Sequence, residues 1–136
     1  MDSESRMKVQ TSFGRCLTHE RFFDRFYEIF IASHPDIRPM FARTDMSRQK
    51  GLLRHGLMSA LMYAESDLMA KACIDRIRES HGRSRLNVRP ELYQHWLAGI
   101  VQAVSECDPE FTSALGRLWR EALLPAVERI QSGYHD

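Results

Sequence analysis

The sequence predicts an all-α fold of about six to eight helices, expected to form one domain over residues 1–136. Three observations support this prediction. Apolar residues recur at helical spacing along most of the chain. No segment shows the alternation of apolar and polar residues that a half-buried strand would show. The corner HPDIRP is too short and too rich in proline for a simple up-down bundle.

Composition excludes several classes of function. The net charge of +1 supplies no field that would attract nucleic acid or an anionic membrane. No apolar run is long enough for a membrane span, and the opening MDSESRMKVQ lacks the apolar core of a signal peptide. We therefore expect a cytoplasmic protein without membrane or nucleic-acid partners. The three cysteines fit neither a disulfide framework nor a zinc spacing, so reduced thiols in or near the core are expected.

The first two helices are predicted from an apolar stripe and from turn residues. A first helix is expected over residues 3–16, and Thr18 is expected to cap the second. The second helix carries apolar residues at helical spacing: Phe23, Phe26, Tyr27, Phe30 and Ile31. Pro35 ends it, and residues 35–41 are predicted to form a turn or short helix that reaches Phe41.

Two further helices follow in the middle of the chain. Asp45 or Ser47 is expected to start the third, and a close helix crossing would explain Gly56 in its middle, where glycine costs about 1 kcal/mol relative to alanine. Its inner stripe is Gln49, Leu52, Leu53, Leu57, Ala60, Leu61 and Ala64. Ser66 is expected to cap the fourth. The inner face of that helix is Ala70, Cys73, Ile74, Ile77 and His81.

The last two helices are separated from these by the loop GRSRLNV. Pro90 fits the first turn of the fifth helix. The buried stripe of that helix is Tyr93, Trp96, Leu97, Ile100, Val101 and Val104. Asp108 and Pro109 are expected to open the last helix, and Pro125 is expected to kink it.

The histidines offer one kind of site. No HxxxH, HExxH or CxxC is present, so a zinc or di-iron site is not expected, and no phosphate loop or GxSxG nucleophile is found. Haem iron needs only one protein ligand, because the macrocycle supplies four nitrogens. His81 continues an apolar stripe and is the candidate, with a hydrogen-bonded core histidine as the competing interpretation. His34, His55 and His95 are expected outside the site.

The chain resembles the bacterial single-domain globins, the flavohaemoglobin-like branch without its reductase, from about residue 17 to Tyr134. The segments that carry the resemblance are FYEIFIASHPDIRPMF, TDMSRQKGLL and VRPELY, the last placed after a helix-ending histidine. The resemblance implies a globin-like arrangement of helices around a haem pocket. It also implies haem b (iron protoporphyrin IX) as cofactor and His81 as the iron ligand.

The same resemblance assigns roles to several other residues. Phe41 would stack on the porphyrin, Tyr27 would donate a hydrogen bond to bound oxygen, and Gln49 would be the distal glutamine, one turn before Leu53. Two alternatives stay open: Tyr27 as a core aromatic, and Gln49 as a solvated residue, because the corner before it is two residues shorter than in close relatives. The implied cofactor-binding set is Phe41, Tyr27, Gln49, Leu53, Ile77, Val88, Tyr93 and Leu97, with no catalytic residue.

The sequence departs from the family pattern in two places. Pro90 lies two residues farther from His81 than usual, which leaves Arg83 at the ungapped position. A guanidinium stays protonated and cannot ligate iron, so we infer a two-residue insertion in the loop. The last-helix position that holds a glutamate in flavohaemoglobins is Ile130 here, with Glu128 on another face. This weakens the case for peroxidase-like or dioxygenase-like chemistry.

Three functions are compatible with these residues. The first is a non-enzymatic haem protein that binds a diatomic gas, O2, NO or CO. The second is a haem-free globin-fold regulatory or binding module, since fold alone does not fix function. The third is a haem enzyme that detoxifies NO and needs a separate reductase as partner, because no FAD or NAD domain follows in the sequence.

Overall fold

The computed structural model describes residues 1–136, and all of its regular structure is helical. This confirms the predicted all-α class. The elements are α1 (Ser3–Leu17), α2 (Phe22–Ala32), the 3-10 helix η1 (Arg38–Phe41), α3 (Met46–Tyr63), α4 (Leu68–Ser80), the 3-10 helix η2 (Pro90–Leu92), α5 (Tyr93–Cys107) and α6 (Ser113–Gln131). None of these helices is both long enough and apolar enough to cross a membrane.

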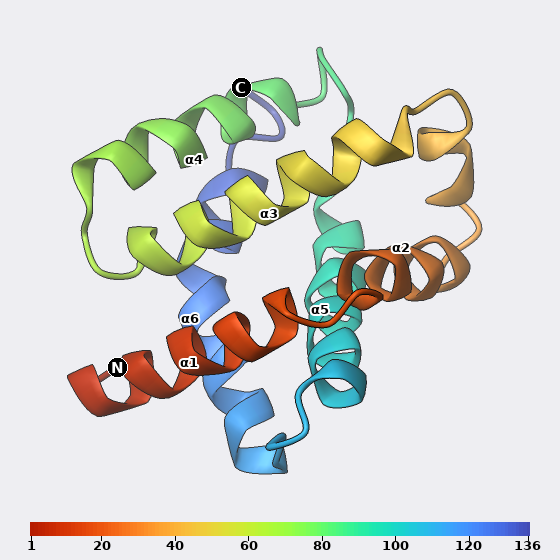
Figure 1. The fold of residues 1–136 in the computed structure, drawn as a ribbon. Helices are drawn as coiled ribbons and strands as arrows, with labels where there is room; N and C mark the ends of the chain where they lie inside the picture. Colours follow the sequence, from red (N-terminus) through yellow and green to blue (C-terminus); the bar gives the residue numbers. More distant parts are fainter.

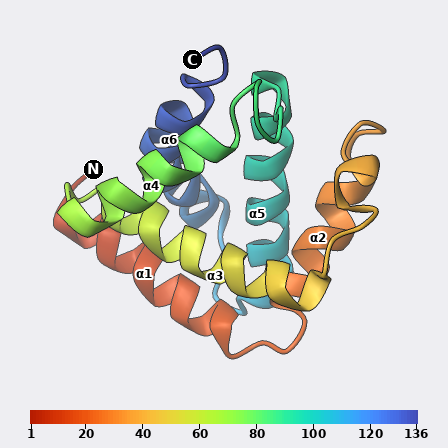
Figure 2. The same ribbon diagram turned by 90° about the horizontal axis from the view of Figure 1, so that it is seen from above.

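Helices α3 and α4 form an antiparallel pair that packs on α6 (Figure 1). Helix α5 packs against α2 on one side and against α6 on the other, and α1 packs on both α5 and α6. In the view from above (Figure 2), α3 runs along the lower part of the picture and α5 and α6 lie above it. The short corner with η1 connects α2 to α3, so the chain does not form a simple up-down bundle.

A close helix contact joins α2 and α5. A Cβ atom at Gly99 would lie 3.1 Å from Cε1 of Phe26, so a side chain there would press on this fully buried ring. Phe26 also packs against the rings of Phe30 and Trp96. The prediction of a close helix crossing at Gly56 is wrong, because a Cβ atom at this position would meet nothing within 4 Å.

Aspartate side chains cap three of the helices. Asp2, Asp45 and Asp67 each accept a hydrogen bond from a backbone N–H in the first turn of α1, α3 and α4. Asp45 is therefore confirmed as a cap. Ser66 is not one, because it lies in the left-handed region at φ 64°. Thr18 was expected to cap α2 but ends α1, where its hydroxyl donates to a carbonyl of the last turn.

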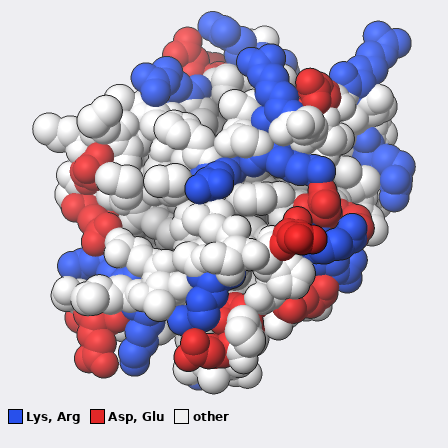
Figure 3. Space-filling model, viewed as in Figure 1, with Lys and Arg blue, Asp and Glu red and all other residues white.

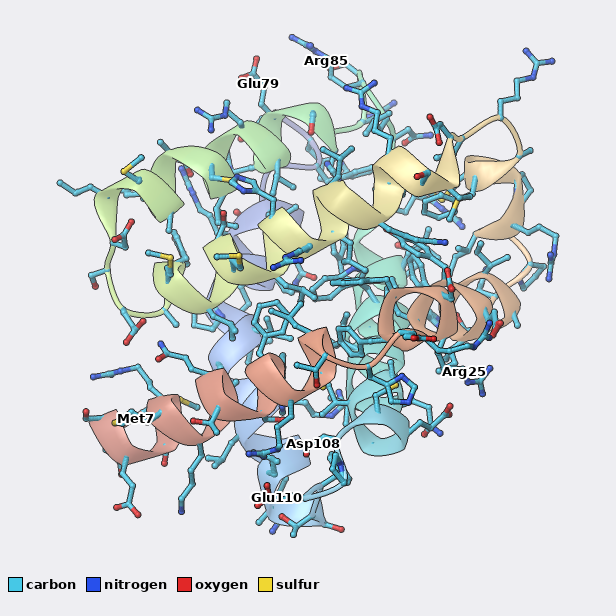
Figure 4. All side chains as sticks on the ribbon, in the orientation of Figure 1. Met7, Arg25, Glu79, Arg85, Asp108 and Glu110 are labelled. Carbon is cyan, nitrogen blue, oxygen red and sulfur yellow. The ribbon has the colours of Figure 1, made fainter.

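Helix α6 begins later than the sequence predicts. Its N-cap is Thr112, whose side chain accepts a hydrogen bond from the N–H of Leu115. Asp108 ends α5 instead, and its buried carboxylate binds Ser12 and Arg15 of α1. In Figure 4, Asp108 lies at the corner between α5 and α6, beside the end of α1. The carboxylate therefore joins two parts of the fold rather than starting a helix.

The inner stripes and the core agree largely with the predicted pattern. Leu52 is an exception, since it is exposed while Leu53 and Leu57 face inward. Trp119 is the largest fully buried side chain, and its indole N–H donates to Ser12 at 2.9 Å, so no polar atom is left unpaired there. The expectation of reduced thiols is confirmed by three buried, unpaired cysteines: Cys16, Cys73 and Cys107.

Candidate functional site

His81 lies at the end of α4, as its C-cap, and is half-buried. Burial lowers the pKa of His81, and a hydrogen bond to the carbonyl of Ile77 opposes this only in part. The imidazole is therefore neutral near pH 7. A neutral imidazole has one ring nitrogen with a free lone pair, which is the form that binds a metal ion.

The hydrogen bonds around His81 indicate which nitrogen that is. The Ser80 hydroxyl donates to the carbonyl of Ile77 at 3.0 Å and lies 3.0 Å from Nδ1 of His81. The Ser80 hydroxyl has one proton and donates it to the Ile77 carbonyl. Its oxygen can then only accept from His81, so Nδ1 carries the proton of the imidazole. The tautomer is inferred from these bonds. Nε2 is then unprotonated, and it makes no hydrogen bond within the protein.

A second group of predicted residues lies on α2, η1 and α3. The rings of Tyr27 and Phe41 meet edge to face, with 5.6 Å between centroids. The Tyr27 hydroxyl donates to the backbone carbonyl of Gln49 at 3.4 Å. Leu53, one turn further along α3, is buried. Phe41 and Gln49 are both half-buried, so each can reach the interior or the surface.

The hydroxyl of Tyr27 remains protonated over the ordinary pH range. Burial raises its pKa to about 12, and the hydrogen bond to Gln49 opposes this effect only slightly. Tyr27 is therefore a buried side chain whose hydroxyl keeps its proton and can donate a hydrogen bond. The open alternative of a simple core aromatic would require only the ring to be buried, and does not explain this long bond to a carbonyl.

The remaining predicted residues lie on the His81 side. Ile77 precedes His81 by one turn on α4, and the N–H of Val88 donates to the His81 carbonyl at 3.0 Å. Tyr93 and Leu97 are buried in the first turns of α5. The apolar members of both groups belong to, or pack against, one continuous hydrophobic cluster: Tyr27, Phe41, Leu53, Ile77, Val88, Tyr93 and Leu97. No hydrogen bond joins His81 to the group on α2 and α3.

The electron-donating network of flavohaemoglobins is not formed by these side chains. Burial raises the pKa of Tyr93, and its hydroxyl makes no hydrogen bond within the protein. Ile130 packs against the hydrophobic cluster, and Glu128 is exposed to solvent. His81 therefore has Ser80 and a backbone carbonyl as its partners instead of a tyrosine–glutamate pair.

The other histidines lie elsewhere. His55 is exposed on α3. His34 and His95 meet edge to face at the joint of α2 and α5, with 5.2 Å between ring centroids. No group of three or more histidine, cysteine or carboxylate side chains could hold a metal ion.

An open cleft of about 470 Å³ lies between α2, η1 and α3. Tyr27 and Ile31 line it together with charged side chains, and Lys50 of α3 pairs with Asp24 of α2 across it. Acidic and basic side chains are interspersed over the face shown in Figure 3, with the basic ones more frequent along its upper edge. Neither the cleft nor this face carries a field of one sign.

Sequence reasoning missed three residues around His81. Ser80 holds the imidazole, and a hydroxyl directly before the candidate ligand was the signal for it. Asn87 and Tyr134 form a hydrogen bond of 2.6 Å over the loop that follows α4. The local sequence around Asn87 and Tyr134 does not predict this pair, because the two residues are far apart in the sequence.

Six helices that cross around one apolar cluster, with a neutral histidine at the end of the fourth, define a globin. No protein-family model matches the chain, and no curated protein matches it. A protein of Pseudomonas aeruginosa PAO1, whose crystal structure is described as highly homologous to a human hemoglobin, is 39% identical. The match covers 97% of this chain and 99% of that one, at a TM-score of 0.92. The chain belongs to the globin family, as a bacterial single-domain globin.

Proposed function

We propose that the chain is a haem protein that binds O2, or another diatomic gas such as NO or CO, with residues 1–136 as one globin domain. The arrangement of His81 carries this proposal. Its Nδ1 is held by the Ser80 hydroxyl at 3.0 Å, and its Nε2 makes no hydrogen bond within the protein. Histidines that ligate metals are commonly oriented in this way, by a hydrogen bond at the other ring nitrogen. His81 is therefore the proposed ligand to the iron of haem b.

The side chains around His81 fit a flat and mostly apolar group. Ile77 and Val88 pack against the hydrophobic cluster next to His81 in the chain, and Leu53 and Leu97 belong to that cluster. Phe41 is an aromatic ring that is only half-buried, so its free surface is available for stacking on a porphyrin. When bound, the haem supplies the open coordination position at which a diatomic gas binds.

Tyr27 would stabilise the bound gas. Its present hydrogen bond to the Gln49 carbonyl is longer than the usual range for an O–H···O bond, so its replacement costs little. The side chain of Gln49 makes no hydrogen bond within the protein and can supply a second donor. A buried donor such as the Tyr27 hydroxyl acts more strongly on a polar ligand than it would in water.

The arrangement supports binding rather than catalysis. Tyr93 and Glu128 do not form the network that would make His81 a stronger electron donor. The similarity to a haemoglobin-like protein points the same way. Sustained NO turnover would require electrons from a separate reductase.

The test is an absorption spectrum of the protein expressed with ample haem, as purified, reduced, and reduced with CO. We compare the wild type with His81→Gly and with His34→Gly as matched control. Both histidines lie outside a helix interior, so glycine is tolerated at each. The wild type and the control should show a Soret band that shifts with CO. His81→Gly should lose or weaken both, and added imidazole should restore them.

Two results would contradict the proposal. An unchanged spectrum in His81→Gly would remove His81 as the ligand. A wild-type protein that takes up no haem, even on titration, would leave a haem-free globin-fold binding module in which His81 is a packing residue.

A further inference from the structure

Residues 133–136 lie over the loop of residues 82–88, which follows α4 (Figure 1). The N–H of Arg83 donates to the carbonyl of Tyr134 at 2.7 Å. In return, the Tyr134 hydroxyl donates to Oδ1 of Asn87 at 2.6 Å. The loop is therefore held near both of its ends by the same tyrosine. We refer to these two hydrogen bonds as the clasp.

The segment that carries Tyr134 is itself fixed on α4. Arg78 forms an ion pair with Asp136 at 2.5 Å, and its side chain runs along the backbone of Gly133. A Cβ atom at Gly133 would lie 2.5 Å from Cγ of Arg78, so any other residue there would force the Arg78 side chain to move. Glu79 of α4 and Arg85 of the loop, labelled in Figure 4 at this edge, form a separate solvent-exposed ion pair at 3.3 Å that is not part of the clasp.

Backbone hydrogen bonds connect the loop held by Tyr134 to His81. Asn87 has φ 56°, and its N–H donates to the carbonyl of Gly82 at 2.8 Å. The next residue, Val88, donates its N–H to the carbonyl of His81 at 3.0 Å. The position of Asn87 therefore sets the position of Val88. Val88 in turn restrains the carbonyl of His81 through this hydrogen bond.

We propose that Tyr134 and Asn87 are positioning residues for His81. They hold the loop so that Nε2 of His81 keeps one direction towards the iron. This inference rests on the proposed function. A loop that is two residues longer than the family pattern has more conformational freedom to lose, and the clasp supplies the restraint that a shorter loop provides by its length.

The test uses three variants and one control. Tyr134→Phe removes the hydroxyl that donates to Asn87. Asn87→Gly removes the side-chain oxygen that accepts this bond, and glycine also allows the positive φ. The backbone bond from Arg83 to Tyr134 is present in both variants. Asn87→Asp keeps an acceptor oxygen and also tolerates this backbone region, so it should rescue the contact. Tyr63→Phe is the control, because the Tyr63 hydroxyl makes no hydrogen bond within the protein.

Two quantities are measured on each variant. The first is amide hydrogen exchange over residues 83–88, in the haem-loaded and the haem-free protein. The second is the iron–histidine stretching band of the haem-loaded ferrous protein. Loss of one hydrogen bond should speed exchange of these amides about fivefold in Tyr134→Phe and Asn87→Gly, and the double variant should add little more. In both variants the stretching band should shift or broaden.

Asn87→Asp and Tyr63→Phe should match the wild type in both measurements. If exchange rises while the stretching band stays unchanged, the clasp is merely structural and the inference is overturned. It is also overturned if neither quantity changes. A wild-type protein that binds no haem overturns the proposed function. A wild type that binds haem through His81, with an unchanged band in the variants, overturns this inference alone.

Discussion

Removal of Arg15 should destabilise the fold by about 3 kcal/mol, because it leaves the carboxylate of Asp108 buried without its counter-charge. The Asp108 side chain is 0% exposed and accepts two hydrogen bonds from Arg15, at 2.6 and 3.0 Å. It accepts two more, from the Ser12 hydroxyl at 2.6 Å and from the N–H of Glu110 at 2.9 Å. Breaking a buried pair costs about 3–5 kcal/mol. Arg15 is 26% exposed, so solvent screens part of this, and the lower end applies to Arg15→Met.

The expected loss is large enough to measure by thermal unfolding. An unfolding entropy of about 2.1 cal/mol/K per residue corresponds to about 0.3 kcal/mol/K for this chain, so about 3 kcal/mol lowers Tm by about 10 °C. Arg129→Met is the matched control. Its ion pair with Asp75 is 40% and 39% exposed, and such a pair contributes about 0–1 kcal/mol. An effect of Arg15→Met no larger than that of the control would refute the reasoning.

The contribution of Asp108 should also depend on pH. Burial tends to raise the pKa of Asp108, but the hydrogen bonds from Arg15 and Ser12 outweigh it, and the pKa is lowered overall. A carboxyl group whose folded-state pKa is lowered stabilises the fold above its unfolded pKa of about 4. That stability is lost as the pH falls through the folded-state pKa. The difference in unfolding free energy between wild type and Asp108→Asn should therefore be full at pH 7 and shrink below about pH 4.

Two further predictions concern the gas ligand and the helix contacts. Tyr27→Phe should speed O2 dissociation about tenfold in stopped-flow measurements, as expected for the loss of one hydrogen bond to a polar ligand, whereas Tyr63→Phe should leave the rate unchanged. Gly56→Ala should stabilise the protein against urea by about 1 kcal/mol, because a Cβ atom there meets nothing within 4 Å. Gly99→Val should destabilise it by about 1–3 kcal/mol, because the side chain would press on Phe26. A Gly99→Val variant at least as stable as the wild type would contradict this account of the α2–α5 contact, and a destabilised Gly56→Ala would contradict the open space at Gly56.

The fold was predictable where the pattern is local. Helical spacing identified all six long helices, and Asp45 was found as a cap because a carboxylate before an apolar stripe is a local signal. Three predicted caps failed: Thr18 and Ser66 for local backbone reasons, and Asp108 because of a tertiary contact. Asp108 has the right local sequence to open a helix, yet it binds Arg15 across the fold, and charge pairing in the interior outweighs a capping bond. Gly56 and Gly99 are equally conspicuous in the sequence, and only the packing shows which of them makes a contact.

The candidate site was predictable from residue types but not in its geometry. His81 and Ile77 are one helical turn apart, so their shared face follows from spacing. The bond between the Tyr27 hydroxyl and the backbone of Gln49 could not be foreseen, because it depends on how α2 and α3 cross. Gln49 itself had two interpretations, and its half-buried position is compatible with both.

The sequence pattern left two candidates near the expected ligand position, His81 and Arg83, and a two-residue insertion in the loop after α4 was inferred to reconcile them. Arg83 stands where an ungapped comparison places the ligand, yet its side chain is exposed and its N–H is used by Tyr134. His81 ends the helix, is half-buried, and keeps one ring nitrogen free. If His81 is the ligand, the inferred two-residue insertion lies after it, in the loop that Tyr134 contacts. An insertion at this point would loosen the peptide of His81 unless another part of the chain held it, and Tyr134 with Asn87 is the contact that does so.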